Sequence, residues 1–210
     1  MTAADWAAVA LSLRVAAAAT ALALAPGIGA GWFLARTASR WKPAVEVAVM
    51  LPLVLPPVVT GYALLVVLPS SVAFSWLAAV FASAVVGFPL LVQAVRVGVE
   101  AVDPDLVRAA RVDGAGRGAA FRHVVLPLTA PAVAAGAALH FARALGEFGA
   151  TIVVAGNIPG RTQTLPLALY TRLHQVGGEG AALRLAAVAV VVAAGSLLAY
   201  RWLLRRWAAA

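Results

Sequence analysis

The chain of 210 residues has no cysteine, a single lysine and few acidic side chains. Without cysteine, both disulfides and metal sites built from thiolates are excluded. With only 16 Lys and Arg and 8 Asp and Glu, charged residues make up 11% of the chain. Soluble domains contain about 25% charged residues, so this scarcity argues against an ordinary soluble fold.

Hydrophobic residues instead make up 63% of the chain, and its mean hydropathy is +0.95. Five apolar segments are each at least as long as the ~20 residues that cross a bilayer core. These segments cover residues 6–34, 45–68, 74–99, 128–155 and 181–204. The sequence therefore predicts an all-α integral membrane protein with about five transmembrane helices in one domain, residues 1–210, embedded in membrane lipid.

Basic residues are divided unevenly between the two sides that these segments define. Eleven lie on the side that contains the loop after the first segment, and four lie on the other side. Since Lys and Arg are enriched in cytoplasmic loops, we expect the N-terminus outside and the C-terminus in the cytoplasm. The net charge of +8 then reflects this bias and anionic headgroups, so we expect no nucleic-acid partner.

The stretch ALALAPGIGA could pass for the cleavage region of a signal peptide. A signal peptide begins with basic residues, whereas the residues before the first apolar run include Asp5 and neither Lys nor Arg. Cleavage would also remove one segment and disturb the agreement between segment number and charge. We therefore expect the first segment to be a membrane helix.

Eight charged residues gather between positions 100 and 122. Asp103 as N-cap, Pro104 in the first turn and Asp105 at the positive end of the dipole predict a short helix. A glycine-rich turn beginning at Gly114 would end it. One interpretation is a solvated loop that only orients the protein. The other is a docking element, because small residues allow close approach and flanking charges select the partner.

This loop resembles the EAA loop of ABC importer permeases, whose pattern is Glu-Ala-Ala, three residues, Gly, nine residues, Ile, one residue, Leu-Pro. The chain keeps Ala-Ala, Gly and Leu-Pro in register, with Val124 for Ile and Arg108 for Glu. The resemblance implies the type I, MetI-like permease fold, with residues 100–127 as a coupling helix in a cleft of a cytoplasmic ATPase subunit. The coupling candidates are Arg108, Ala109, Ala110, Gly114, Leu126 and Pro127.

Three further stretches resemble the permease of molybdate importers. They are LPLVLPPVVTGY (51–62), FARALGEFGATI (141–152) and GNIPGRTQTLP (156–166). The resemblance implies a pathway for molybdate, or tungstate, in the cytoplasmic (inner) membrane of a prokaryote. Its implied partners are a second copy of the chain, two ABC ATPase subunits and an external molybdate-binding protein. A sulfate or thiosulfate permease is the alternative, although the Phe148-Gly149-Ala150-Thr151 continuation favours molybdate.

Two features inside the predicted spans are candidates for the pathway or its gate. Pro56 and Pro57 remove backbone donors and kink the second segment, and the freed carbonyls need protein or a wet cavity. Arg143 and Glu147 are one helical turn apart in the fourth segment, where charged groups usually face the bundle interior. In both cases a purely structural role, a packing kink or a bracing pair, is the alternative.

The segment 157–180 is the longest loop on the predicted outer side. The resemblance implies that it forms part of the docking surface for the binding protein. Arg161 and Arg172 are the candidates to meet acidic groups there. A plain solvated loop is the alternative.

Several catalytic motifs are missing from the sequence. The phosphate-binding G-x-x-x-x-G-K-[ST] loop does not occur around the only lysine, Lys42, so we expect ATP and Mg²⁺ to be used by the partner and no cofactor to be bound here. H-E-x-x-H is also missing. His123, His140 and His174 belong to distant segments, which favours loop or packing roles over a metal site. An intramembrane enzyme and a passive anion channel remain as rivals, and both leave the 100–127 motif unexplained.

Overall fold

The computed structural model describes the backbone of residues 1–208 and the side chains of residues 1–202. The side chains of Arg205 and Arg206, which belong to the eleven basic residues counted above, lie outside this range. All regular elements of the described residues are helical, which confirms the all-α prediction. The elements are α1 (Ala3–Arg36), α2 (Lys42–Val54), α3 (Pro57–Val67), α4 (Trp76–Glu100), α5 (Pro104–Val112), α6 (Arg117–Ala120), the π-helical turn η1 (Phe121–Val125), α7 (Leu126–Leu145), α8 (Gly149–Val154), α9 (Leu165–Leu173) and α10 (Glu179–Ala208).

Four helical stretches are individually long and apolar enough to cross a membrane: α1, α4, the continuous run from α6 through α7, and α10. Helices α2 and α3 meet the same criterion only as a pair, and they are bent by 114° at the break between them. The break is at Leu55–Pro56, where Leu55 adopts an extended conformation as expected before proline. The predicted proline kink is therefore present as a full break.

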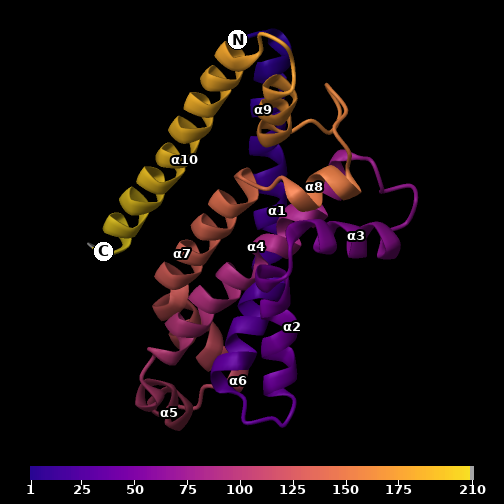
Figure 1. Ribbon diagram of the computed structural model, residues 1–210. Coiled ribbons are helices and arrows are strands. Elements are labelled where there is room, and N and C mark those ends of the chain that lie inside the picture. The colour runs from indigo at the N-terminus through magenta and orange to yellow at the C-terminus, as the bar shows by residue number, and fades with distance from the viewer. Residues whose placement is uncertain (209–210) are drawn as a thin grey trace.

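The fourth predicted segment, 128–155, also differs from a single span. The helix that covers it begins earlier, at Arg117, and ends at Leu145, after which Gly146–Phe148 form an irregular link to α8. In Figure 1, α3 and α8 lie next to each other and across the direction of α1. Hydrophobic periodicity did not distinguish this arrangement from a straight span, because the sequence is apolar on both sides of the link at Gly146–Phe148.

Helix α4 forms the centre of the bundle and packs between α1 and α7. Gly27 and Gly31 of α1 make the approach to α4 possible. A Cβ atom at these positions would lie 2.6 Å from Leu91 Cδ2 and 2.7 Å from Val95 Cβ. In membranes such small residues allow helices to pack closely by dispersion contacts, since lipid supplies little hydrophobic driving force between helices.

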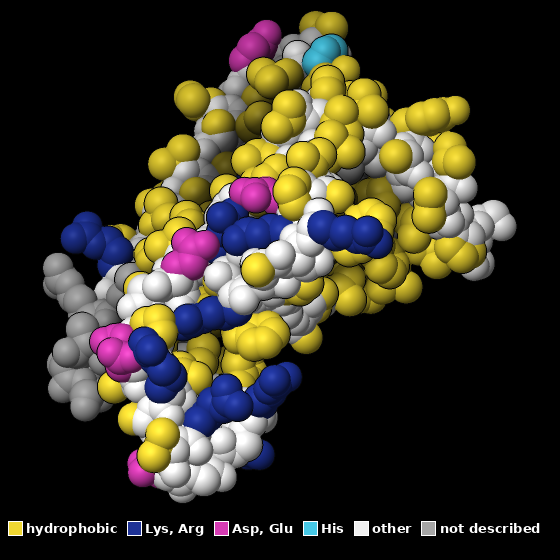
Figure 2. Space-filling view, turned by 90° about the horizontal axis from the view of Figure 1, so that it is seen from below, with side chains coloured by type: hydrophobic (Ala, Val, Ile, Leu, Met, Phe, Trp, Pro, Cys, Tyr) yellow, Lys and Arg dark blue, Asp and Glu magenta, His cyan; other side chains and the backbone are white. Residues whose placement is uncertain are grey.

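The bundle has two different ends (Figure 1). Helices α5 and α6 form one end, whereas α9 lies beside the N-terminus at the other. Viewed from below, Figure 2 shows Lys and Arg side chains gathered over the end formed by α5 and α6, with apolar side chains covering much of the rest. This asymmetry has the pattern expected of a cytoplasmic end. The orientation of the chain in the membrane stays a prediction.

Candidate functional site

Helix α5 is defined at its beginning by the residues that the sequence indicates. Asp103 is the N-cap, and its Oδ1 accepts a hydrogen bond from the backbone N–H of Asp105 at 2.8 Å. Pro104 occupies the first helical position, where no backbone donor is required. The local start signals are therefore confirmed in the geometry.

The end of α5 depends on Gly114. Its φ angle is +92°, a left-handed conformation that disfavours residues with a Cβ atom. The N–H of Ala115 donates to the carbonyl of Ala110 at 3.0 Å, and the N–H of Gly114 donates to the carbonyl of Arg111 at 3.2 Å. This pair of bonds is the Schellman arrangement that closes a helix on a left-handed residue. It turns the chain from α5 back towards α6.

Helix α5 buries none of its residues against the rest of the chain. Leu106 is 50% exposed and Val112 is 86% exposed, although both are apolar. Arg108 forms an ion pair only with Asp105 on the same helix, and both side chains are 73% exposed. Ala109 is exposed as well. The helix thus presents an exposed surface of small, apolar and charged side chains, which suits contact with another protein.

The six coupling candidates fall into two groups. Arg108, Ala109, Ala110 and Gly114 lie on α5 and its closing turn, whereas Leu126 and Pro127 begin α7. Between the groups, the π-helical turn η1 joins α6 to α7 without interrupting the helix. Helix α5 is therefore joined to a membrane helix by a short connection through α6 and η1.

The two breaks in the apolar segments contact each other. A Cβ atom on Gly149, the first residue of α8, would lie 2.8 Å from Pro57 Cβ, the first residue of α3. One turn further along, a Cβ atom on Gly61 would lie 2.7 Å from the carbonyl oxygen of Ala150. Helices α3 and α8 thus pack almost backbone to backbone. Discontinuous helices in membrane proteins occur where they are buried in protein or line a cavity.

Arg143 and Glu147 form the ion pair that their spacing allows. Arg143 Nη1 lies 2.8 Å from Glu147 Oε2, and the side chains are 30% and 1% exposed, respectively. The pair is an ionic contact rather than an aligned hydrogen bond, because Oε2 has no hydrogen-bond partner. The other oxygen, Oε1, accepts from the N–H of Ala150 at 2.8 Å and so fixes the start of α8. Glu147 therefore links the end of α7 to the α3–α8 junction.

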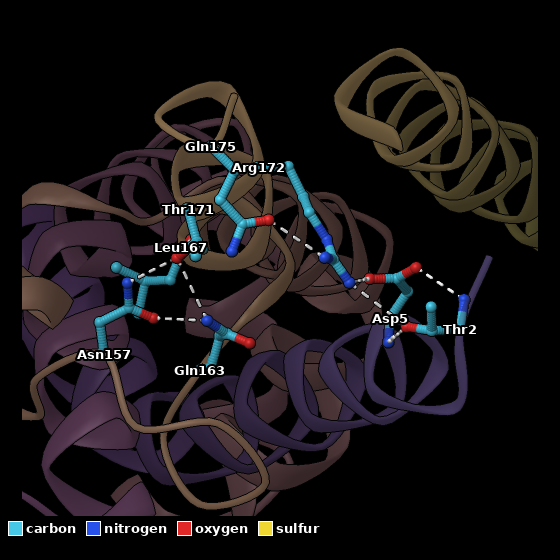
Figure 3. Close-up of polar contacts among 8 residues, drawn as sticks. All are labelled: Thr2, Asp5, Asn157, Gln163, Leu167, Thr171, Arg172 and Gln175. Atoms are coloured by element: carbon cyan, nitrogen blue, oxygen red, sulfur yellow. Dashed lines mark hydrogen bonds and ion pairs between the residues drawn. The ribbon is translucent and has the colours of Figure 1, made fainter. Parts of the chain in front are cut away.

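The opposite end of the bundle is held together by side-chain contacts that cross the sequence (Figure 3). Arg172 of α9 lies 2.9 Å from Asp5 of α1, and its exposed fraction is 26% against 5% for Asp5. Arg172 also donates to Gln175 at 3.2 Å. Arg161, by contrast, is exposed, and its side chain has no ion pair or hydrogen bond within residues 1–202. Of the two predicted docking arginines, only Arg161 is free for an external contact.

A small polar network orders the loop before α9 and was not predicted (Figure 3). Gln163 Nε2 donates to Asn157 Oδ1 at 2.9 Å, and Asn157 Nδ2 donates to the hydroxyl of Thr171 at 2.9 Å. These amides belong to the polar run GNIPGRTQT, so their composition was visible, but their pairing was not. The network joins the loop to α9 through the side chains of Asn157, Gln163 and Thr171.

His140 has the packing role expected of it. The ring is fully buried in α7, with Nε2 3.2 Å from the carbonyl of Ala84 and Nδ1 3.0 Å from the hydroxyl of Thr20. A Cβ atom at Gly87 would lie 2.8 Å from the ring. His140 therefore joins α1, α4 and α7 at the centre of the bundle.

Residues 27–208 match the family described as "Binding-protein-dependent transport system inner membrane component". The chain belongs to this family. It is accordingly a multi-pass component of an inner-membrane transport system and not an enzyme, and ATP hydrolysis belongs to a separate subunit. Family membership also implies a substrate-binding protein as a partner.

Relatives and solved structures agree with this assignment to an inner membrane component. The "Molybdenum transport system permease protein ModB" of Escherichia coli K12 is 45% identical over 98% of this chain and 96% of its own. The "Sulfate transport system permease protein CysT" of Salmonella typhimurium is 35% identical over 82% of this chain and 65% of its own. A chain of the MetNI methionine ABC transporter, solved in inward-facing conformations, superimposes with a TM-score of 0.77 at 17% identity, covering 95% of this chain and 94% of that one. The predicted MetI-like fold is thus confirmed.

Proposed function

We propose that this chain forms the membrane pathway for molybdate in an ATP-driven importer. The observation that carries the proposal is the 45% identity to a molybdenum permease over 98% of the chain, which exceeds the 35% identity to a sulfate permease over 82% of it. Tungstate has the same charge and is close in size, so it is expected to share the route. Sulfate is the second candidate substrate, supported by the weaker similarity.

Helix α5 is proposed to dock on the ATPase subunit. Its support is the exposed surface that includes Leu106, Val112 and Arg108, together with the match of the 100–127 loop to the EAA pattern. Arg108 stands where the pattern has Glu, so the partner would present an acidic or neutral group at this position. We assign ATP and Mg²⁺ to that partner and no cofactor to this chain.

The α3–α8 junction, with Pro56, Pro57, Arg143 and Glu147, is proposed to line the pathway or its gate. The support is the contact between two broken helices and the location of a buried ion pair beside it. Because Arg143 is already neutralised by Glu147, the junction offers passage rather than tight capture of a dianion. Capture would belong to the external binding protein.

We further propose a homodimer with its route between two copies, oriented with α5 in the cytoplasm and α9 outside. Four to five spans per chain are few for a complete pathway, and the basic residues gather at the α5 end. On the outer side, Arg161 is the candidate contact for the binding protein, because Arg172 is engaged with Asp5.

The test is reconstitution of the chain in liposomes with its cognate ATPase and binding protein. Molybdate uptake should require all three proteins and ATP, and excess tungstate should compete with it. A single cysteine, placed at an exposed position of α3 in this cysteine-free chain so that a disulfide can form only between two copies, should crosslink the chain to a dimer. Oxyanion flux without ATP would instead establish a channel, preferential sulfate uptake would establish the sulfate permease, and recovery of monomer alone would reject the dimer.

A further inference from the structure

An open cavity of ≈ 640 Å³ lies between the end of α1 and the α5–α6–η1 loop. Three arginines line it: Arg36 from α1, Arg111 from α5 and Arg117 from α6. Its apolar wall includes Ile28, Trp32 and Phe121, and the rings of the two aromatic residues meet edge to face with centroids 5.8 Å apart. No acidic side chain of the described residues lines this cavity, so its positive charge is uncompensated.

The arginines are arranged to receive an anion. Arg36 is held in place because its Nη2 donates to the carbonyls of Val99 and Val102, both at 3.0 Å. Neither Arg111 nor Arg117 has an ion pair or hydrogen bond from its side chain within residues 1–202. Guanidinium groups bind phosphate oxygens strongly and often through two parallel hydrogen bonds. A phosphate group is therefore the anion that this geometry suits.

The apolar wall of the cavity indicates which kind of molecule would bring the phosphate group. Trp32 and Ile28 precede Arg36 by four and eight residues on one helix, so they lie roughly 6 and 12 Å further along its axis into the apolar bundle. Trp32 is 41% exposed, which is typical of aromatic residues at a membrane–water boundary. A free phosphate ion would leave this wall uncovered, and a soluble ATPase subunit would have to enter the membrane to reach it. A molecule with an anionic head and an acyl chain covers both parts.

We propose that this cavity binds an anionic phospholipid of the inner leaflet, with its phosphate among the three arginines and an acyl chain along Trp32 and Ile28. The lipid would connect the end of α1 to the α5–α6 loop and so support the coupling loop from its membrane side. This site goes beyond the proposed transport function and does not depend on which oxyanion is carried.

The test measures how much phosphatidylglycerol the purified chain retains after exchange into nanodiscs or mild detergent, by native mass spectrometry. Phosphatidylcholine with the same acyl chains and inorganic phosphate serve as the comparison ligands. Each charge-assisted hydrogen bond to the phosphate contributes roughly tenfold in affinity, so R111Q/R117Q should bind phosphatidylglycerol about a hundred-fold more weakly. R111K/R117K should restore most of the binding.

The matched control is R108Q/R122Q, which removes the same charge from the same loop at residues that do not line the cavity. It should retain phosphatidylglycerol clearly better than R111Q/R117Q. Equal loss in both variants would mean diffuse attraction and would overturn the site. Equal retention of inorganic phosphate would also overturn the lipid site, in favour of a free-anion site. Release of the lipid when the ATPase subunit is added would overturn it in favour of a subunit contact.

Discussion

The arginines of the α5–α6 loop differ from Arg143 and Arg172 in how their charge is compensated. On α7 and α9, Arg143 and Arg172 each contact a carboxylate of this chain whose exposed fraction is only 1% and 5%, respectively. On the α5–α6 loop, Arg111 and Arg117 have no such partner among the described residues, and Arg108 has only an exposed one. Paired charges brace a structure, whereas unpaired charges are available to other molecules. Arginine therefore has different roles in the paired set, Arg143 and Arg172, and in the unpaired set, Arg111 and Arg117.

The largest effect is expected from Gly114→Val, which changes the loop that carries the unpaired arginines. A non-glycine residue in a left-handed conformation costs about 1–2 kcal/mol, and a β-branched one more, so the turn after α5 should be lost. ATP-dependent uptake in the reconstituted system should fall on the order of tenfold or more. The chain itself should remain folded, because a Cβ atom at Gly114 would meet nothing within 4 Å.

Gly116→Ala is the matched control for this change. Gly116 has a φ of −63° and also meets nothing within 4 Å, so alanine is compatible with its conformation. Uptake should remain close to the wild-type rate. If Gly114→Val transports normally and still assembles with the ATPase, the role proposed for the α5 turn is wrong.

A smaller effect, on stability rather than coupling, is expected from Arg143→Met, which removes one of the paired arginines. The substitution leaves the carboxylate of Glu147 buried without its counter-charge. Because Arg143 is 30% exposed, we expect a loss of about 2–3 kcal/mol in the free energy of unfolding, below that of a fully buried pair. Denaturant titration in detergent micelles, followed by tryptophan fluorescence, would measure it.

Two variants sharpen this result. R143M/E147Q removes both charges, while the glutamine oxygen can still accept from the N–H of Ala150, and it should recover most of the lost stability. Arg111→Gln removes an unpaired charge from α5 and should change the free energy of unfolding by less than about 0.5 kcal/mol. Equal destabilisation by Arg111→Gln and Arg143→Met would contradict the comparison between paired and unpaired arginines.

A smaller loss of stability than that of Arg143→Met is expected from Arg172→Gln, which opens the contact with Asp5. A partly exposed pair of this kind stabilises by about 1 kcal/mol, and the loss should appear as faster amide exchange in α9. Arg161→Gln should leave exchange unchanged and weaken binding of the external protein instead. The reverse pattern would mean that Arg172, and not Arg161, faces the partner.

Much of the α5 region could be predicted because its determinants lie within a few residues of one another. Asp103 and Pro104 define the start, and Gly114 defines the end, by backbone conformation alone. A kink at Pro56 was predicted for the same reason, since proline removes a backbone donor wherever it occurs, and the structure has a full break there. The ion pair between Arg143 and Glu147 also followed from their spacing.

The helix end between these two residues was not predicted. Leu145 is the last residue of α7, so Glu147 lies beyond the helix and binds the N–H of Ala150 in addition to Arg143. The apolar run continues through the break, and hydrophobic periodicity carries no signal for it. The reason becomes visible only with α3 in place, because Gly149 of α8 must approach Pro57 of α3, and Gly61 of α3 must approach the backbone of Ala150.

The sequence by itself determined that the chain is a membrane protein, where its basic residues lie along the chain, and which loop resembles the EAA pattern. These properties depend on composition and on neighbours within one or two helical turns. Only the tertiary structure decided that Arg172 meets Asp5, 167 residues away, that His140 meets Thr20, and that three arginines surround one cavity. Such contacts depend on how helices pack, and residues far apart along the chain carry no local signal of their pairing.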